Sequence, residues 1–288
     1  MNPAELCISQ FVQNEHADDL GVMPVSLEGT VVGSMCSMQG SRYCVLTNIH
    51  PADGSLSRTA QARQIFKRME TALKSVDMSF SNVVRTWFFI DEILAWYEDF
   101  NKVRTEFFNE HRVFDGLVPA STGVGLSSSG VSAITANAIA VQPGNSNVRV
   151  NSVKSPLQCS ASDYRSSFSR AVELSWHDSR KLYISGTASI APDGATVHAG
   201  DPDKQIALTM DVVKALLKSR AMEWSDTTRA IAYFSDMKDV TRFDTYREKT
   251  QLTMLPVTMT HADICRKELL FEIELDAVSD KTMLKTLV

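Results

Sequence analysis

The sequence predicts an α+β protein of two tandem domains, each a mixed sheet with helices packed on one face. Three observations support this prediction. The two halves repeat one order of strand-like and helix-like segments. Each half contains an arginine, an apolar strand and an aspartate in succession, as RTWFFID (85–91) and RAIAYFSD (229–236). A length of 288 residues, 44% of them hydrophobic, is enough for two ordinary domains, which we place at residues 1–150 and 151–288.

The first half contains a clear amphipathic helix. In residues 60–75, Ile65, Phe66, Met69 and Leu73 recur at helical spacing, so one face is apolar and the other charged. Residues 83–91 are rich in β-branched and aromatic side chains, which is typical of a strand. A second helix over 96–108 and a strand over 117–126 complete the half.

The second half repeats this order after a polar segment. Residues 127–151 are rich in Ser, Gly and Asn, and indicate either a flexible linker or a poorly ordered strand pair. Two apolar runs before the PDG turn predict a hairpin. The expected elements are the hairpin at 182–194, a helix at 203–218, a strand at 229–236, a helix at 239–251 and a strand at 268–278.

Composition narrows the class of protein. The net charge of −5 offers no extended basic surface for phosphates, so we expect no nucleic-acid partner. The five cysteines are scattered and never form a CxxC pair, which argues against a disulfide framework or a zinc site. The first residues lack a basic region followed by an apolar run, and no stretch reaches membrane-spanning length. We therefore expect a cytoplasmic protein with no membrane association.

The order of signals in the second half resembles the YjgF/RidA superfamily, whose domains have a chorismate-mutase-like fold. The shared signals are an ISG run ending in PDG, Gln205 near a helix start, a strand ending in aspartate and a terminal EIE. In that family an arginine after a Pro-Ala pair binds the substrate carboxylate during imine hydrolysis. Here Pro119-Ala120 precedes Ser121, so the chain departs from the family pattern at that point. The resemblance allows a homo-oligomer, either a trimer or a smaller assembly.

Two longer stretches are similar to the chorismatases, which are tandem YjgF-like hydrolases of chorismate. They are SPLQCSASDYRSSFSRA (155–171), followed by SGTASI (185–190), and ADICRKELLFEIE (262–274). The resemblance implies a hydrolase that acts on chorismate or a related cyclic enol-ether carboxylate. The implied products are pyruvate and a hydroxylated ring acid such as 3-hydroxybenzoate.

Glu272 is the candidate catalytic acid. Hydrolysis of an enol ether needs a proton delivered to the enolpyruvyl methylene, which suits a carboxyl group whose pKa is raised by burial. Strand alternation puts Glu272 and Glu274 on one face and Phe271 and Ile273 on the other. The alternative is a structural role for Glu272, as a helix cap or in an ion pair with an arginine.

Recognition of two carboxylates calls for arginines, whose planar fork suits bidentate binding. The candidates are Arg170, within the FSRA match, and Arg247, nine residues before Pro256 at a position similar to a chorismatase substrate arginine. A solvated helix face is the other interpretation of Arg247. Tyr164 either donates a hydrogen bond to a ring hydroxyl or fills the edge of a cleft.

Cys265 stands seven residues before Glu272, as in chorismatases that release 3-hydroxybenzoate, which implies contact with the substrate ring and selection of the product. A plain buried thiol is the alternative, and a nucleophile would need a base such as His261 nearby. The remaining histidines share no metal-ligand spacing, and GVGLSSSG lacks the lysine of a phosphate loop. We expect no metal and no cofactor.

Two other functions fit the same fold. One is a RidA-like enamine or imine deaminase, which would need an arginine from another position to bind the carboxylate. The other is a non-catalytic ligand-binding protein, because a fold alone does not determine function. The partner that we expect is a small anionic carboxylate substrate.

Overall fold

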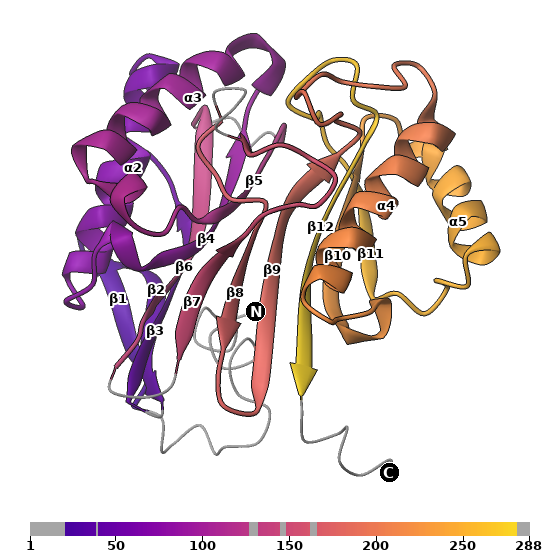
Figure 1. Ribbon diagram of the computed structural model, residues 1–288. Helices are drawn as coiled ribbons and strands as arrows, with labels where there is room; N and C mark the ends of the chain where they lie inside the picture. The colour runs from indigo at the N-terminus through magenta and orange to yellow at the C-terminus, as the bar shows by residue number, and fades with distance from the viewer. Residues whose placement is uncertain (1–20, 39, 127–131, 145–147, 162–165, 281–288) are drawn as a thin grey trace.

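A computed structural model describes residues 21–38, 40–126, 132–144, 148–161 and 166–280. The first half forms a six-stranded mixed sheet with two helices on one face (Figure 1). Its strand order is β1-β2-β3-β6-β4-β5. The elements are β1 (Met23–Leu27), β2 (Thr30–Met38), β3 (Ser41–Ile49), α2 (Arg58–Lys74), β4 (Val83–Ile90), α3 (Ile93–Glu110), β5 (Ala120–Val124) and β6 (Ile134–Gln142).

The second half forms another six-stranded mixed sheet, in the order β11-β10-β12-β9-β8-β7. Its elements are β7 (Arg149–Val153), β8 (Ala171–Ser175), β9 (Ser179–Ala188), α4 (Pro202–Ser219), β10 (Thr227–Phe234), α5 (Val240–Lys249), β11 (Val257–His261) and β12 (Phe271–Asp280). In each half a parallel pair, β4–β5 or β10–β11, lies beside an antiparallel partner, β6 or β12. The predicted tandem α+β architecture is confirmed, and the division at residue 150 stays a prediction.

Each sheet buries its outer face under its own helices. Phe66 of α2 stacks on Phe107 of α3 with ring centroids 5.1 Å apart, and Phe88 of β4 lies 5.4 Å from Phe66. In the second half, Phe243 of α5 packs against Phe234 of β10 and Phe271 of β12. The periodic apolar faces seen in the sequence therefore form two separate helix-on-sheet cores.

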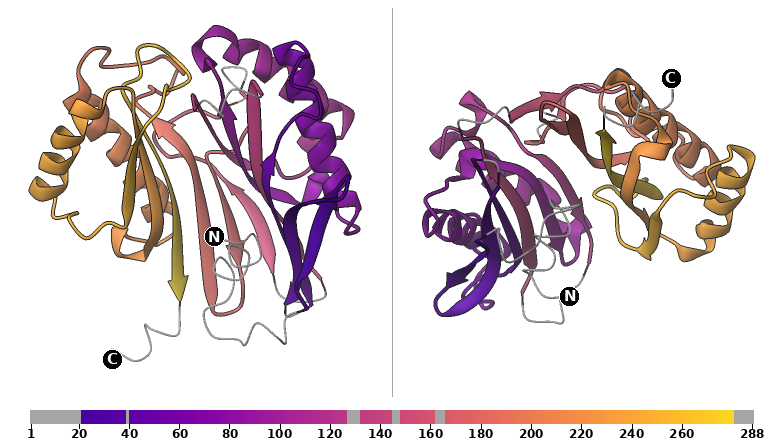
Figure 2. Two further views of the ribbon diagram at one scale, coloured as in Figure 1. Left: turned by 180° about the vertical axis from the view of Figure 1, so that it is seen from behind. Right: turned by 90° about the horizontal axis from the view of Figure 1, so that it is seen from below.

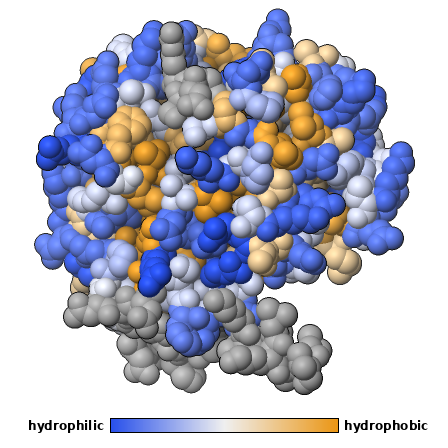
Figure 3. Space-filling model, viewed as in Figure 1, coloured by the Kyte–Doolittle hydropathy of each residue, from blue (hydrophilic) through white to orange (hydrophobic). Residues whose placement is uncertain are grey.

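The inner faces of the two sheets cover each other, as Figure 2 shows with the helices on the outside of both. Tyr43 and Ile139 of the first sheet share an apolar cluster with Val172, Leu174 and Tyr183 of the second. In the space-filling view, apolar side chains gather at the centre of the face where the halves meet (Figure 3). The two halves therefore contact each other through their inner faces, so a site between them can take residues from both.

Two sequence-based expectations are corrected. Residues 127–151 contain parts of two strands, but β6 lies between β3 and β4 while β7 borders β8 in the other sheet, so the two do not pair. The expected hairpin at 182–194 is one long strand, β9, which is held by β8 and β12. The return after the PDG turn contributes only an isolated bridge between Ile190 and Thr196. Neighbours distant in the sequence decided both outcomes.

Strands β1, β2, β3, β8 and β11 were not predicted. Within the described ranges, no helix combines the length and the apolar character needed to cross a membrane.

Candidate active site

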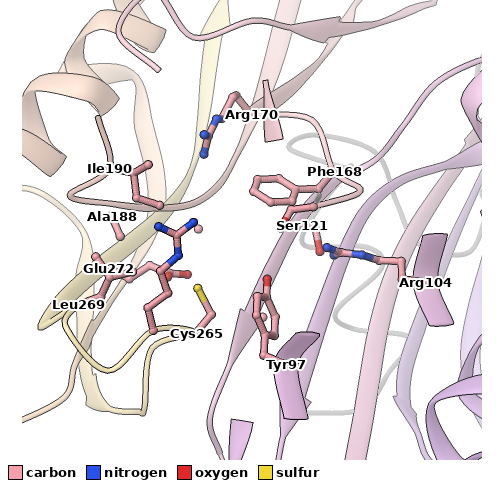
Figure 4. A pocket seen from close by; sticks show the side chains of 14 residues that line it. Tyr97, Arg104, Ser121, Phe168, Arg170, Ala188, Ile190, Cys265, Leu269 and Glu272 are labelled. Atoms are coloured by element: carbon pink, nitrogen blue, oxygen red, sulfur yellow. The ribbon is translucent and has the colours of Figure 1, made fainter. Parts of the chain in front are cut away.

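A pocket lies between the two halves and takes side chains from both (Figure 4). The first half contributes residues of α3 and β5. The second contributes the segment before β8, the end of β9, the loop before β12 and β12 itself. The lining residues are Tyr97, Arg104, Ser121, Gly123, Ser166, Phe168, Arg170, Gly186, Ala188, Ile190, Cys265, Arg266, Leu269 and Glu272.

Glu272 supplies a carboxyl group to this pocket, and it is 5% exposed. It sits near the start of β12, the strand between β10 and β9, opposite Tyr233 and Ala188. Within the described part of the chain, its side chain forms no hydrogen bond and no ion pair. Burial, reinforced by Glu274, raises the pKa of Glu272 to about 8, although Arg85 and Arg170 act in the opposite direction. At neutral pH this carboxyl therefore carries a proton.

A glycine makes room for this carboxyl. A Cβ placed on Gly186 of β9 would lie 2.0 Å from Oε1 of Glu272 and 3.2 Å from Cγ2 of Thr122. Real carbon and oxygen atoms do not approach so closely, so any side chain at Gly186 would displace the acid. The glycine of the SGTASI stretch is therefore required by the position of Glu272.

Arginines surround the acid. Arg170 is buried, donates from Nε to the carbonyl oxygen of Cys159 at 3.0 Å, and lies over the ring of Phe168. Arg104 of α3 is also buried, and its Cζ lies 5.8 Å from the centre of the same ring. Arg266 lines the pocket as well and donates to the carbonyl oxygen of Gly194. Three cations around one protonated carboxyl favour an anionic ligand.

Cys265 lies in the same pocket, and its sulfur points toward the space between Glu272 and Tyr97 (Figure 4). Burial, with a contribution from Glu272, raises the pKa of the Cys265 thiol to about 12. Because the thiolate is the reactive form, this residue is not an activated nucleophile at neutral pH. A neutral thiol can still contact a ligand.

The structure brings together three of the residues singled out in the sequence, namely Glu272, Arg170 and Cys265. It does not bring Arg247 to them. Arg247 lies on α5, where it pairs with Asp244 at 3.2 Å and covers the ring of Phe243. Asp244 and Phe243 lie on the same helix as Arg247, so these local contacts hold its guanidinium away from the pocket. Tyr164 lies outside the described residues.

Sequence reasoning missed Tyr97, Arg104 and Arg266. Tyr97 and Arg104 are seven residues apart on α3, so they share one helix face, and that spacing was available in the sequence. Arg266 directly follows Cys265 in a stretch already singled out. Nothing in the sequence showed that the α3 face points across to β12, because contact between the halves decides this.

The model of the family described as endoribonuclease L-PSP matches residues 49–134 and 160–279. The chain belongs to the endoribonuclease L-PSP family. Within that family it is similar to a chorismatase of Streptomyces hygroscopicus, with 27% identity over 215 residues, covering 67% of this chain and 60% of the relative. A chorismatase of Streptomyces rapamycinicus is 27% identical over 222 residues, covering 68% and 64%. This chain therefore spans less than two thirds of the length of either relative.

A solved chorismatase structure matches the fold with a TM-score of 0.68. The identity is 21%, and the match covers 88% of this chain and 80% of the other. At this identity the likeness concerns the fold alone. It extends through both sheets, which agrees with the two stretches matched by the family model.

Proposed function

We propose that this member of the endoribonuclease L-PSP family is a chorismatase-like hydrolase of chorismate or a related cyclic enol-ether dicarboxylate. The observation that carries the proposal is a buried and protonated Glu272, unpaired among the described residues, in a pocket lined by three arginines. An acid without a counter-ion has a proton to give, and the arginines provide charges for two carboxylates. The curated relatives named chorismatase support the substrate class.

In the proposed reaction, Glu272 transfers its proton to the terminal methylene of the enolpyruvyl group. This leaves a cation on the carbon bonded to the ether oxygen. Water adds to that carbon and returns a proton to the Glu272 carboxylate. The resulting hemiketal then breaks the bond between this carbon and the ether oxygen. The hemiketal hydroxyl loses its proton and the ether oxygen gains one, which gives pyruvate and a ring alcohol. Loss of water from the ring acid yields a hydroxybenzoate.

The arginines hold the ligand during these steps. Arg170 and Arg104 both line the pocket beside Phe168, and on this proposal their guanidinium groups bind the two carboxylates of the ligand. Arg266 adds a third cation near Glu272. Cys265 contacts the ring as a neutral thiol and influences whether the ring loses water, the role that the chorismatase resemblance implies. No metal or cofactor takes part in this scheme.

The direct test is incubation of the pure protein with chorismate, with pyruvate measured by coupling to lactate dehydrogenase. We expect release above the spontaneous rate. Glu272→Gln preserves shape and removes the acidic proton, so kcat should fall by about 10²-fold or more, whereas KM should change much less. A folded Glu272→Gln protein with near-normal kcat would remove this residue from the mechanism.

A second candidate is an imine deaminase, favoured by one observation. The family arginine after Pro-Ala is absent at Ser121, yet Arg104 and Arg170 supply carboxylate-binding cations from other positions of the same pocket. Hydrolysis of 2-aminoacrylate without hydrolysis of chorismate would favour this function. If the protein is a non-catalytic binding protein, it should bind a ligand but hydrolyse neither chorismate nor 2-aminoacrylate.

A further inference from the structure

The inner face of β12 carries three carboxylates in alternate positions, and their surroundings differ sharply. Glu274 and Asp276 are paired with arginines, whereas Glu272 has no ion-pair partner within the described residues. All three are buried. What distinguishes the proposed acid is thus the absence of a counter-ion, and the structure indicates how that absence is maintained.

Glu274 lies two residues from the acid and pairs with two nearby arginines. Its Oε2 accepts from Nη2 of Arg85 at 2.6 Å, and its Oε1 accepts from Nη1 of Arg229 at 2.9 Å. Nε1 of Trp87 donates to the same carboxylate at 2.8 Å. The side chains of Glu274 and Arg85 are both 0% exposed, so solvent does not screen this pair.

Arg85 has further N–H donors besides those that bind Glu274. Its Nη2 also donates to Oγ1 of Thr122 at 2.6 Å, and this oxygen accepts from the backbone N–H of Gly186, the residue against which the Glu272 carboxyl lies. Within the described residues, Nε and Nη1 of Arg85 are buried without a hydrogen-bond partner. The charge of Arg85 already acts on the acid, because it lowers the pKa of the Glu272 carboxyl.

We propose that Glu274 is a positioning residue that engages Arg85 in a buried ion pair and thereby keeps this guanidinium from becoming the counter-ion of Glu272. The acid consequently keeps its proton at neutral pH. This inference rests on the proposed function only in taking Glu272 as the catalytic acid. Glu274 itself touches no ligand in this scheme, because it does not line the pocket.

Other charged or titratable groups also face Glu272, and they are unchanged in the single variants compared below. They come from every element packed around it: Tyr233 on β10, Arg85 on β4, Tyr97 and Arg104 on α3, Arg170 before β8, and Cys265 and Arg266 before β12. Burial, with contributions from Glu274 and Glu272, raises the pKa of Tyr233, so this phenol stays neutral.

The first measurement compares the pH dependence of kcat for the wild type and Glu274→Gln. An uncompensated charge within several ångströms shifts a carboxyl pKa by about one unit or more, so the alkaline limb should move to lower pH by that amount. At pH values well below the limb, kcat should return toward the wild-type value. KM should change little. An equal loss of kcat at every pH, with no shift, is the result of a merely structural role and overturns the inference.

Asp276→Asn is the matched control. It makes the same kind of change on the same face of the same strand, and Asp276 is bonded to Arg229 rather than Arg85. Its pH profile should shift much less than that of Glu274→Gln. Equal shifts in the two variants would mean that total charge, not the Arg85 pair, governs the acid, and would overturn the inference.

A second readout needs no substrate. The carbonyl stretch of the protonated Glu272 carboxyl is followed by difference infrared spectroscopy during a pH titration and assigned by its absence in Glu272→Gln. The midpoint should fall by about one unit or more in Glu274→Gln. It should return toward the wild-type value in Arg85→Gln/Glu274→Gln, which removes both charges and serves if the single variant does not fold.

The infrared result separates the two proposals. A midpoint that shifts in Glu274→Gln supports the positioning role even if the protein releases no pyruvate from chorismate, in which case only the proposed function fails. An unchanged midpoint in the single variant, or a midpoint in the double variant as low as that of the single variant, overturns the positioning role whether or not the protein is a chorismatase.

Discussion

At the scale of single residues, position in the fold separates the two candidate arginines. Arg170 lines the pocket with Glu272, whereas Arg247 is held on α5 by Asp244 and Phe243. The two guanidinium groups have similar sequence signals, so only their positions in space distinguish them.

Substitution of these two arginines tests that distinction. Arg170→Gln should raise the KM for a dicarboxylate by about 10-fold or more, because a charge-assisted hydrogen bond contributes about 1.5–3 kcal/mol. Arg247→Gln should leave KM near the wild-type value. Steady-state kinetics of both folded variants gives the answer. A larger effect from Arg247→Gln would restore it as the carboxylate ligand.

Gly186 offers a second test at this scale. Gly186→Ala places a Cβ 2.0 Å from Oε1 of Glu272, so the acid must move and kcat should fall by at least about 10-fold. Gly123→Ala is the control from the same pocket. A Cβ at Gly123 would lie 3.6 Å from Cε2 of Tyr97, which is an ordinary contact. Rates and circular dichroism of both variants are compared. Equal activity of the two would show that Glu272 tolerates displacement.

The raised pKa of Glu272 also has a consequence for stability. The folded protein keeps this proton up to about pH 8, whereas the unfolded chain releases it near pH 4.5. The folded state therefore binds more protons across this window, and raising the pH lowers the free energy of unfolding until the pH passes about 8. Glu272→Gln lacks this proton equilibrium.

Denaturant unfolding at several pH values measures the effect. The wild type should lose stability relative to Glu272→Gln as the pH rises from about 4.5 to about 8, by an amount on the order of a few kcal/mol. Below about pH 4.5 the difference between the two proteins should be constant. Parallel curves across the whole range would show that the pKa of Glu272 is ordinary.

At the scale of elements, helix α3 connects core and site. Its Phe100, Phe107 and Phe108 pack into the aromatic core of the first half, while Tyr97 and Arg104 line the pocket. Trp96 departs from helical geometry and marks a kink near the start of α3, and its Nε1 donates to the carbonyl oxygen of Asp91 at 2.8 Å. The position of the pocket arginine therefore depends on the packing of the phenylalanines behind it.

Phe66 of α2 is the centre of that packing, with five phenylalanine rings within 6.2 Å of its own. Phe66→Ala should lower the free energy of unfolding by about 3–5 kcal/mol, the usual range for a fully buried aromatic side chain. Phe66→Leu should cost clearly less, because much of the volume is kept. Denaturant unfolding of both variants tests this, and equal losses would contradict the packing argument.

At the scale of the whole molecule, the site exists only where the two halves meet. Tyr97, Arg104 and Ser121 come from the first half, and Glu272, Cys265 and Arg170 from the second. The same boundary is crossed by Arg85 and Trp87, which bind Glu274. The docking of the halves and the state of the acid are thus coupled through one network.

Trp87→Phe tests the contribution of the indole bond to the docking of the halves. The change keeps an aromatic ring and removes the N–H that donates to Glu274, so the free energy of unfolding should fall by about 1.5–3 kcal/mol, the range for a bond to a charged group. Because Arg85 still pairs with Glu274, kcat should stay near the wild-type value. Circular dichroism in denaturant and the pyruvate assay check both. Unchanged stability would mean that the indole bond does not hold the halves together.

The sequence by itself determined the elements whose apolar pattern is local. Local periodicity predicted the helices at 60–75 and 203–218 and the strands around 83–91 and 229–236. Each of these elements buries a periodic apolar face in the core of its own half. It also placed Glu272 and Glu274 on one face of their strand and singled out Arg170 and Cys265. The repeat of arginine, strand and aspartate gave the tandem organisation.

Only the tertiary structure decided which of these residues meet. The sheet assignments of β6 and β7, the single long β9, the absence of Arg247 from the pocket and the presence of Arg104 all depend on partners far away in the sequence. The pairing of Glu274 with Arg85 joins residues 189 positions apart. Local patterns report which face of an element is buried, but the identity of the group across that face depends on how two complete sheets pack together.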